Sequence, residues 1–217
     1  MPICYRDSAW LLASCLAAVS WLAAPLPAQE TRPREPDRSW SGEVDGSVWI
    51  LPDDPDFILL QAYADRGPLH LEGRYNYEDL RTGSLWVGWT WDASGKISLS
   101  VTPALGVVFG NTGGLAPGLE IDVVIGPVEW YGESEYLFDF DSAESDFFYM
   151  WSELGVSPVD WFTVGLAVQR TRVVDTPREI QRGVFVGAFL GPIGLTGYLM
   201  NPDGDEHFGV VQLEYHF

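Results

Sequence analysis

The last nine residues of the chain alternate between two kinds of side chain. Counting back from the end, every second residue is apolar or glycine: Phe217, Tyr215, Leu213, Val211 and Gly209. The residues between them are mostly polar: His216, Glu214, Gln212 and Val210. A period of two is that of a β-strand, whose successive side chains point to opposite faces. The sequence therefore predicts a final strand with one apolar face and one mostly polar face.

This ending resembles the closing strand of bacterial outer-membrane β-barrel proteins. In that superfamily, the barrel-assembly machinery recognises a C-terminal aromatic residue and the alternating apolar residues before it. The resemblance implies an assembly signal made of Gly209, Val211, Leu213, Tyr215 and Phe217. It also implies that the chain lies in the bacterial outer membrane, with its apolar face against lipid.

The beginning of the chain indicates export. Residues 1–28 combine the basic Arg6, an almost wholly apolar run at 9–24 and a small residue, Ala28, as in a cleaved signal peptide. A lipobox-like run at 12–15 leaves a lipoprotein as an alternative, although apolar sequence continues past Cys15. Residues 29–40 are predicted to form a flexible periplasmic lead-in, because 31–38 is rich in proline and charge.

Composition excludes several kinds of site. Both cysteines, Cys4 and Cys15, lie in the predicted signal, so disulfides and thiolate metal sites are not expected. Removing Arg6 and Asp7 from 12 basic and 31 acidic residues leaves 11 and 30, and the net charge stays −19. That charge disfavours binding to nucleic-acid phosphates. The sequence also lacks dinucleotide, phosphate-loop and zinc signatures, so no cofactor is expected.

Residues 41–217 are predicted to form one all-β domain. Alternating segments recur along it, about twelve in all: 44–50, 58–64, 69–77, 85–91, 97–107, 119–125, 128–138, 147–154, 162–170, 183–190, 195–200 and 209–217. The predicted fold is a closed, antiparallel, up-and-down transmembrane β-barrel, with ten or eight strands as alternatives. Pro103 lies inside one segment and predicts a bulge there.

The connections between these segments are predicted to alternate in length. Short turns fall near 66–67, 93–95, 126–127, 157–158 and 191–192, and longer loops at 52–56, 78–83, 110–118, 139–146, 173–181 and 201–207. Short periplasmic turns and long extracellular loops are typical of outer-membrane barrels. A soluble β-sandwich stays as an alternative, because it also alternates apolar and polar residues.

Strand parity predicts which side chains face the lumen. The predicted lumen-lining set is mainly acidic, with Arg74 as the clearest basic partner: Glu43, Asp45, Glu72, Arg74, Glu120, Asp122, Glu129, Glu133, Glu135, Glu153 and Glu214. Aromatic residues predicted at the membrane interfaces are Tyr75, Tyr77, Trp89, Trp91, Trp130, Tyr136 and Tyr215. Carboxylates along a pore attract cations, so the leading hypothesis is a porin-like channel for cations or small solutes. A lumen filled by side chains remains the alternative.

Two other classes of function stay open. The first is a non-conducting barrel whose acidic loops bind partners at the surface, with a weak calcium motif at 201–206. The second is a lipid-modifying enzyme, for which His216, Ser41 and Glu43 are predicted to lie together at barrel closure. No family motif surrounds these three residues, so no catalytic or metal residue is assigned.

Overall fold

The computed structural model describes residues 39–52, 54–173, 179–204 and 206–217, so the predicted signal peptide and most of the lead-in lie outside the described residues. Thirteen strands and one turn of 3-10 helix follow in chain order: β1 (Ser41–Ile50), β2 (Phe57–Arg66), β3 (Leu69–Tyr75), β4 (Thr82–Trp89), β5 (Trp91–Ala93), β6 (Ser98–Gly110), β7 (Gly114–Ile125), β8 (Val128–Asp139), η1 (Ala143–Ser145), β9 (Phe147–Val159), β10 (Phe162–Val173), β11 (Glu179–Leu190), β12 (Ile193–Met200) and β13 (Phe208–His216). Among the described residues, no helix has the length and apolar character needed to cross a bilayer.

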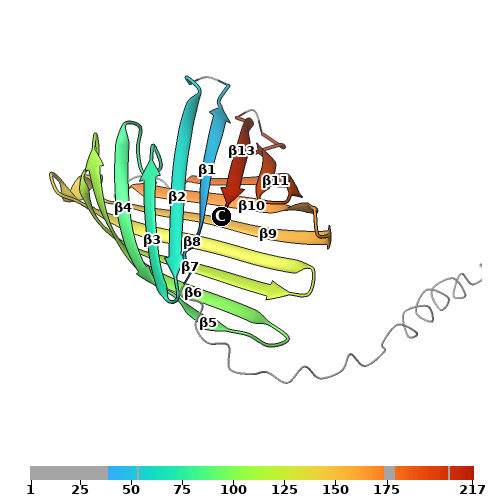
Figure 1. Ribbon diagram of the computed structural model, residues 1–217. Helices are drawn as coiled ribbons and strands as arrows, with labels where there is room; N and C mark the ends of the chain where they lie inside the picture. The colour runs from blue at the N-terminus through green and yellow to red at the C-terminus, as the bar shows by residue number, and fades with distance from the viewer. Residues whose placement is uncertain (1–38, 53, 174–178, 205) are drawn as a thin grey trace, which may run out of the picture. The chain divides into compact units, whose positions relative to one another are not determined.

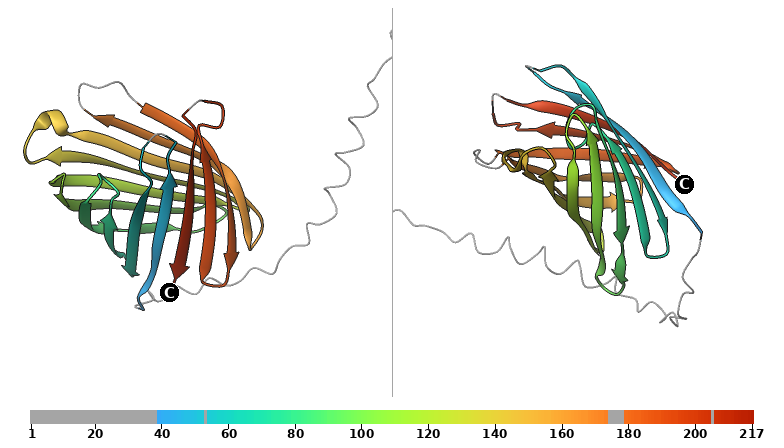
Figure 2. Two further views of the ribbon diagram at one scale, coloured as in Figure 1. Left: turned by 90° about the horizontal axis from the view of Figure 1, so that it is seen from above. Right: turned by 90° about the vertical axis from the view of Figure 1, so that its left-hand side faces the viewer.

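The strands close into a ring. Apart from β4 and β5, strands that follow one another in sequence pair antiparallel, and β1 pairs with β13 from Glu43 opposite His216 to Ile50 opposite Gly209. Figure 1 shows β1 and β13 side by side, and both views of Figure 2 show one continuous wall of strands. Both β4 and β5 pair with β6, so together they make one of the twelve strands of the barrel. The predicted closed, up-and-down barrel of about twelve strands is confirmed.

Pro103 explains why the strand formed by β4 and β5 is interrupted. The register against β6 is the same before and after the break between β4 and β5, with Gly88 opposite Ala104 and Trp91 opposite Val101. The predicted bulge is therefore wrong, because no residue is inserted. Proline has no N–H to donate, and the ladder lapses opposite it without a shift in register.

Three of the short turns are built from a Gly-Pro pair. Gly67, Gly126 and Gly191 have φ values of 58°, 59° and 61°, and each precedes a proline. A positive φ followed by the fixed negative φ of proline fits a type II′ turn, which matches the twist of a hairpin. The turn predicted near 157–158 lies at residues 160–161 instead, because β9 runs on to Val159.

One predicted long loop is wrong. Residues 110–118 were expected to form a loop because they contain four glycines and a proline, but β6 extends to Gly110 and β7 begins at Gly114. A Cβ at position 114 would approach the carbonyl oxygen of Phe138 to 2.4 Å, so glycine is needed here for close strand contact. The connection is residues 111–113, and loop lengths alternate less strictly than predicted.

Large apolar side chains cover the outside of the barrel. Leu85, Leu195 and Val211 are 63%, 52% and 46% exposed, and most strands carry such residues at alternate positions. An outer wall of this kind is suited to hydrocarbon, since a water-soluble protein rarely exposes a continuous apolar surface. The prediction that Tyr77 belongs to this outer face is wrong. The strand β3 ends at Tyr75 and Asn76 has φ 61°, so strand parity no longer applies at position 77.

Candidate functional site in the lumen

The barrel encloses a cavity of about 820 Å³. Its lining runs from Ser41 and His216, at the ends of β1 and β13, inward to Trp49, Tyr149 and Trp151. Residues next to the short turns line it as well, whereas Tyr77 is the single lining residue from the described parts of the long loops. Most of the lining therefore lies in the half of the lumen nearer the short turns, which we call the inner half, and Trp49 and Tyr149 mark where the cavity reaches toward the long loops.

Carboxylates dominate the charged groups of the inner half. Six predicted residues and two others line the cavity: Glu43, Glu120, Glu129, Glu133, Glu153 and Glu214, together with Asp65 and Asp160. No lysine or arginine is among the described residues of this lining. Asp65 is absent from the predicted lumen-lining set because the predicted segment 58–64 stops one residue short of it, whereas β2 continues to Arg66. Asp65 shares the parity of Gln61 and Tyr63, and that alternation would have found it.

Other predicted lumen residues lie elsewhere. Asp45, Glu72, Arg74 and Glu135 are buried, with exposed fractions of 8% or less, and do not line the cavity. Asp122 is partly buried and does not line it either. Parity thus identifies inward residues without separating those that meet open space from those packed against other side chains.

Arg74 organises a buried ion-pair group, which we call the Arg74 cluster. Its guanidinium donates from Nε and Nη2 to the two oxygens of Glu72 at 2.5 and 2.9 Å. It also donates from Nη1 to Glu135 Oε2 at 2.8 Å. The same group lies 4.3 Å from the ring centroid of Tyr77 and 4.5 Å from that of Trp86. These contacts join β3 and β4 to β8 across the lumen and fill part of it.

Two apolar clusters fill more of the lumen toward the long loops. The first contains Ala167, Phe185, Met200, Phe208 and Val210, with Trp49 packed against them. The second contains Trp86, Val108, Ala116 and Leu137. Met200 and Leu137 point into the lumen and have no exposed surface, because the clusters fill the space around them. We call this packed region, including the Arg74 cluster, the outer half of the lumen.

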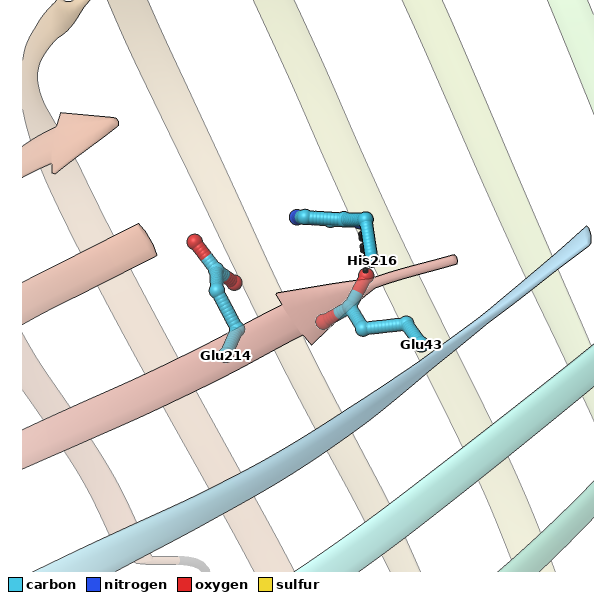
Figure 3. Close-up of side chains that lie close together, drawn as sticks. All are labelled: Glu43, Glu214 and His216. Atoms are coloured by element: carbon cyan, nitrogen blue, oxygen red, sulfur yellow. Dashed lines mark ion pairs between the residues drawn. The ribbon is translucent and has the colours of Figure 1, made fainter. Parts of the chain in front are cut away.

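Two histidines lie beside pairs of carboxylates. His216 contacts Glu43, with Nδ1 and Oε2 3.2 Å apart, and Glu214 lies beside them at the closure of β1 and β13 (Figure 3). His70 is buried and contacts Asp65 through Nδ1 at 2.8 Å. As predicted, His216 and Glu43 come together, but no hydrogen bond joins Ser41 to His216 in the described part of the chain. The arrangement lacks the hydroxyl-to-base contact that nucleophilic catalysis uses.

The acidic loops use their carboxylates in local contacts. Asp139 accepts from the backbone of Asp141 and Ser142, and Asp146 accepts from the backbone of Asp139. In the loop of the weak calcium motif, Asp203 pairs with Arg182 at 2.6 Å. Asp205 of the same motif lies outside the described residues. Calcium binding at residues 201–206 stays a prediction.

No family model and no curated protein match the chain. Among solved structures, it is similar to the KdgM porin, with a TM-score of 0.60 and 12% identity over 81% of this chain and 99% of that one. A second structure, the KdgM porin in complex with disordered oligogalacturonate, gives a TM-score of 0.64 at 10% identity over the same shares of each chain. The Acinetobacter baumannii outer membrane protein Omp33 gives 0.45 at 12% identity over 82% of this chain and 98% of that one. The fold of this chain is that of the bacterial outer-membrane β-barrel proteins.

Proposed function

We propose that this protein is an outer-membrane channel with an acidic lumen that favours cations and small neutral solutes over anions. The observation that carries the proposal is the inner-half cavity, whose described lining has eight carboxylates and no lysine or arginine. Fixed negative charge in a pore attracts cations and repels anions, and the effect strengthens where low-dielectric walls focus the field.

The outer surface supports a membrane location. Leucine, valine and isoleucine side chains stand exposed at alternate positions around the wall. Each unpaired backbone group in hydrocarbon would cost several kcal/mol, and a closed barrel leaves no strand edge unpaired. The fold and the surface together are what a bilayer requires of a spanning β-sheet.

The acidic lining bears on the class of solute. One structure of the KdgM porin contains oligogalacturonate, which is a polyanion. In this chain Glu129, Glu133 and Glu153 would repel such a solute electrostatically. We therefore propose that acidic oligosaccharides are excluded and that cations pass more readily than anions.

Planar-bilayer recording in a potassium chloride gradient tests the proposal. The wild-type protein is expected to conduct with a reversal potential that shows cation preference. The double variant Glu129→Gln, Glu153→Gln removes two charges from the cavity and is expected to lose part of that preference. Glu144→Gln, in the exposed turn η1, removes charge outside the lumen and serves as the matched control. Absence of conductance at every salt concentration, or anion preference, would contradict the proposal.

A second candidate is a non-conducting barrel. It is favoured by the Arg74 cluster and the two apolar clusters, which fill the outer half of the lumen. In that case wild-type protein would leave a bilayer impermeable, and liposomes containing it would swell no faster in one solute than in another. The same recording therefore separates the two candidates.

A further inference from the structure

His70 points a ring nitrogen without a hydrogen-bond partner at two carboxylates. Its side chain is 7% exposed, and its Nε2 is among the buried atoms that make no hydrogen bond in the described structure. Nε2 lies 3.9 Å from Glu72 Oε2 and 3.8 Å from Glu120 Oε1. Because β4 and β6 separate β3 from β7 in the sheet, Glu120 reaches His70 through the lumen.

The other ring nitrogen of His70 is already held. Asp65 lies opposite His70 in the β2–β3 register, and its Oδ1 is 2.8 Å from Nδ1. A carboxylate on one imidazole nitrogen fixes the ring and leaves the lone pair on the other, as it does behind metal-binding histidines. Gly88 lies opposite His70 on β4, and a Cβ there would come within 3.3 Å of the His70 Cβ. The chain thus orients the ring and keeps space beside it.

We propose that His70, Glu72 and Glu120 bind a divalent first-row transition-metal ion, with Zn²⁺ as the reference ion. Their ligand atoms lie within 4.8 Å of one another. Zinc bonds of about 2.0–2.1 Å place tetrahedral donors about 3.3 Å apart, so small side-chain rotations bring the three donors to a bound ion. One imidazole with two carboxylates suits Zn²⁺ and its neighbours better than Mg²⁺ or Ca²⁺. His70 and Glu120 both line the cavity, so water or a solute can reach an ion bound between them.

The distances distinguish the two sides of the His70 ring. On the Nδ1 side the contact is 2.8 Å, a normal hydrogen bond. On the Nε2 side two oxygens stand at 3.8 and 3.9 Å, too far for a hydrogen bond and nearly equidistant. Glu72 also accepts a hydrogen bond from Arg74, whose positive charge offsets part of the negative charge of Glu72. Glu120 and His70 are therefore the stronger ligands of the three.

The Glu43–Glu214–His216 group provides an internal comparison. It too places a histidine near two carboxylates. However, the His216 side chain is 48% exposed and already contacts Glu43 at 3.2 Å through Nδ1. That group has no buried histidine nitrogen left without a partner among the described residues. It is therefore the control site for the proposal.

Metal titration of the folded, full barrel in detergent tests the proposal. Zn²⁺ is measured by competition with a chromophoric chelator, and Co²⁺ by its visible absorption bands. One ion is expected per barrel. His70→Gln is expected to weaken binding about 100-fold or more, and Asp65→Asn, which removes the orienting carboxylate, about 10- to 100-fold. His216→Gln is expected to bind as the wild type does.

Folding of each variant is checked by its heat-modifiable gel mobility, and Glu120→Gln, which changes a partly exposed residue, provides a second ligand variant. Loss of binding in folded His70→Gln and Glu120→Gln supports the site. Wild-type protein that takes up neither ion, or unchanged binding in both ligand variants, overturns it. Loss that follows His216→Gln instead assigns the ion to the other group and also overturns it. None of these outcomes depends on conductance.

Discussion

The two halves of the lumen differ although the same strands build both. In the inner half, inward residues such as Glu129 and Glu153 are acidic and meet open space. In the outer half, the inward residues Leu137 and Met200 have no exposed surface, and Arg74 is held between two carboxylates. The comparison shows that strand parity decides which way a side chain points. The volume of the inward side chains and the sign of their charge decide whether the barrel wall encloses a cavity.

Arg74→Ala is expected to change the outer half most. The substitution leaves Glu72 and Glu135, each 4% exposed, as buried carboxylates without their cation. Breaking a buried pair by removing one partner costs about 3–5 kcal/mol of unfolding free energy. It also removes the side chain that spans from β3 to β8, so single-channel conductance is expected to rise. Urea unfolding in detergent and planar-bilayer recording measure the two effects.

Two controls sharpen the Arg74 prediction. Arg182→Ala removes an arginine whose side chain is 71% exposed, and the unfolding free energy is expected to change little. Arg74→Lys keeps the positive charge and loses the two-pronged guanidinium that binds both oxygens of Glu72. The loss of unfolding free energy is therefore expected to lie between those of the two alanine variants. An Arg74→Ala barrel as stable as Arg182→Ala would show that the outer half does not depend on the Arg74 cluster.

Val211 and Gln212 test the inside and outside of the wall at one level of the barrel. Val211 is 46% exposed on the outer face at mid-strand of β13, and Gln212 faces the cavity. Arginine in place of Val211 is expected to cost about 2–4 kcal/mol in a bilayer, because a charge near mid-membrane is poorly solvated. Gln212→Arg is expected to cost less, since water reaches the cavity, and to shift ion selectivity toward anions.

Unfolding of both variants in lipid vesicles measures the difference between the two faces. Equal losses of unfolding free energy in Val211→Arg and Gln212→Arg would mean that the outer face does not contact hydrocarbon. Unchanged selectivity in Gln212→Arg would show that ions do not pass the inner half. The two measurements bear separately on the membrane location and on the channel.

The fold was largely predictable because its signal is local. The period of two from Gly209 to Phe217 needs no distant contact, and β13 lies where that period predicts it. The errors occur where local rules compete. The sequence predicts a loop at Gly114, but close approach to Phe138 requires glycine inside the strand. Pro103 was expected to insert a residue, yet the ladder only loses a donor there.

The site was predictable in kind more than in detail. Parity alone points Glu120 and Glu153 inward, so an acidic interior follows from the sequence. The contact of Arg74 with Glu135 joins residues 61 apart in the chain, and no spacing rule relates them. The approach of Glu120 to His70 likewise depends on how far the ring of strands curves. Such contacts across a lumen follow from closure, which sequence patterns do not specify at the level of single atoms.

The smallest expected effect lies outside both halves, at the ion pair of Arg182 and Asp203. The Arg182 guanidinium, 2.6 Å away, lowers the pKa of Asp203 below its ordinary value of 3.8 through a direct hydrogen bond and its charge. Because the folded-state pKa is the lower one, the pair stabilises the barrel above pH 3.8 and loses this contribution as pH falls through the folded value. Asp203→Asn is therefore expected to unfold slightly earlier than the wild type at neutral pH and equally at strongly acid pH. Both side chains are more than half exposed, so salt should shrink the difference. A difference unchanged by pH and by salt would mean that Asp203 contributes through the loop backbone and not through its charge.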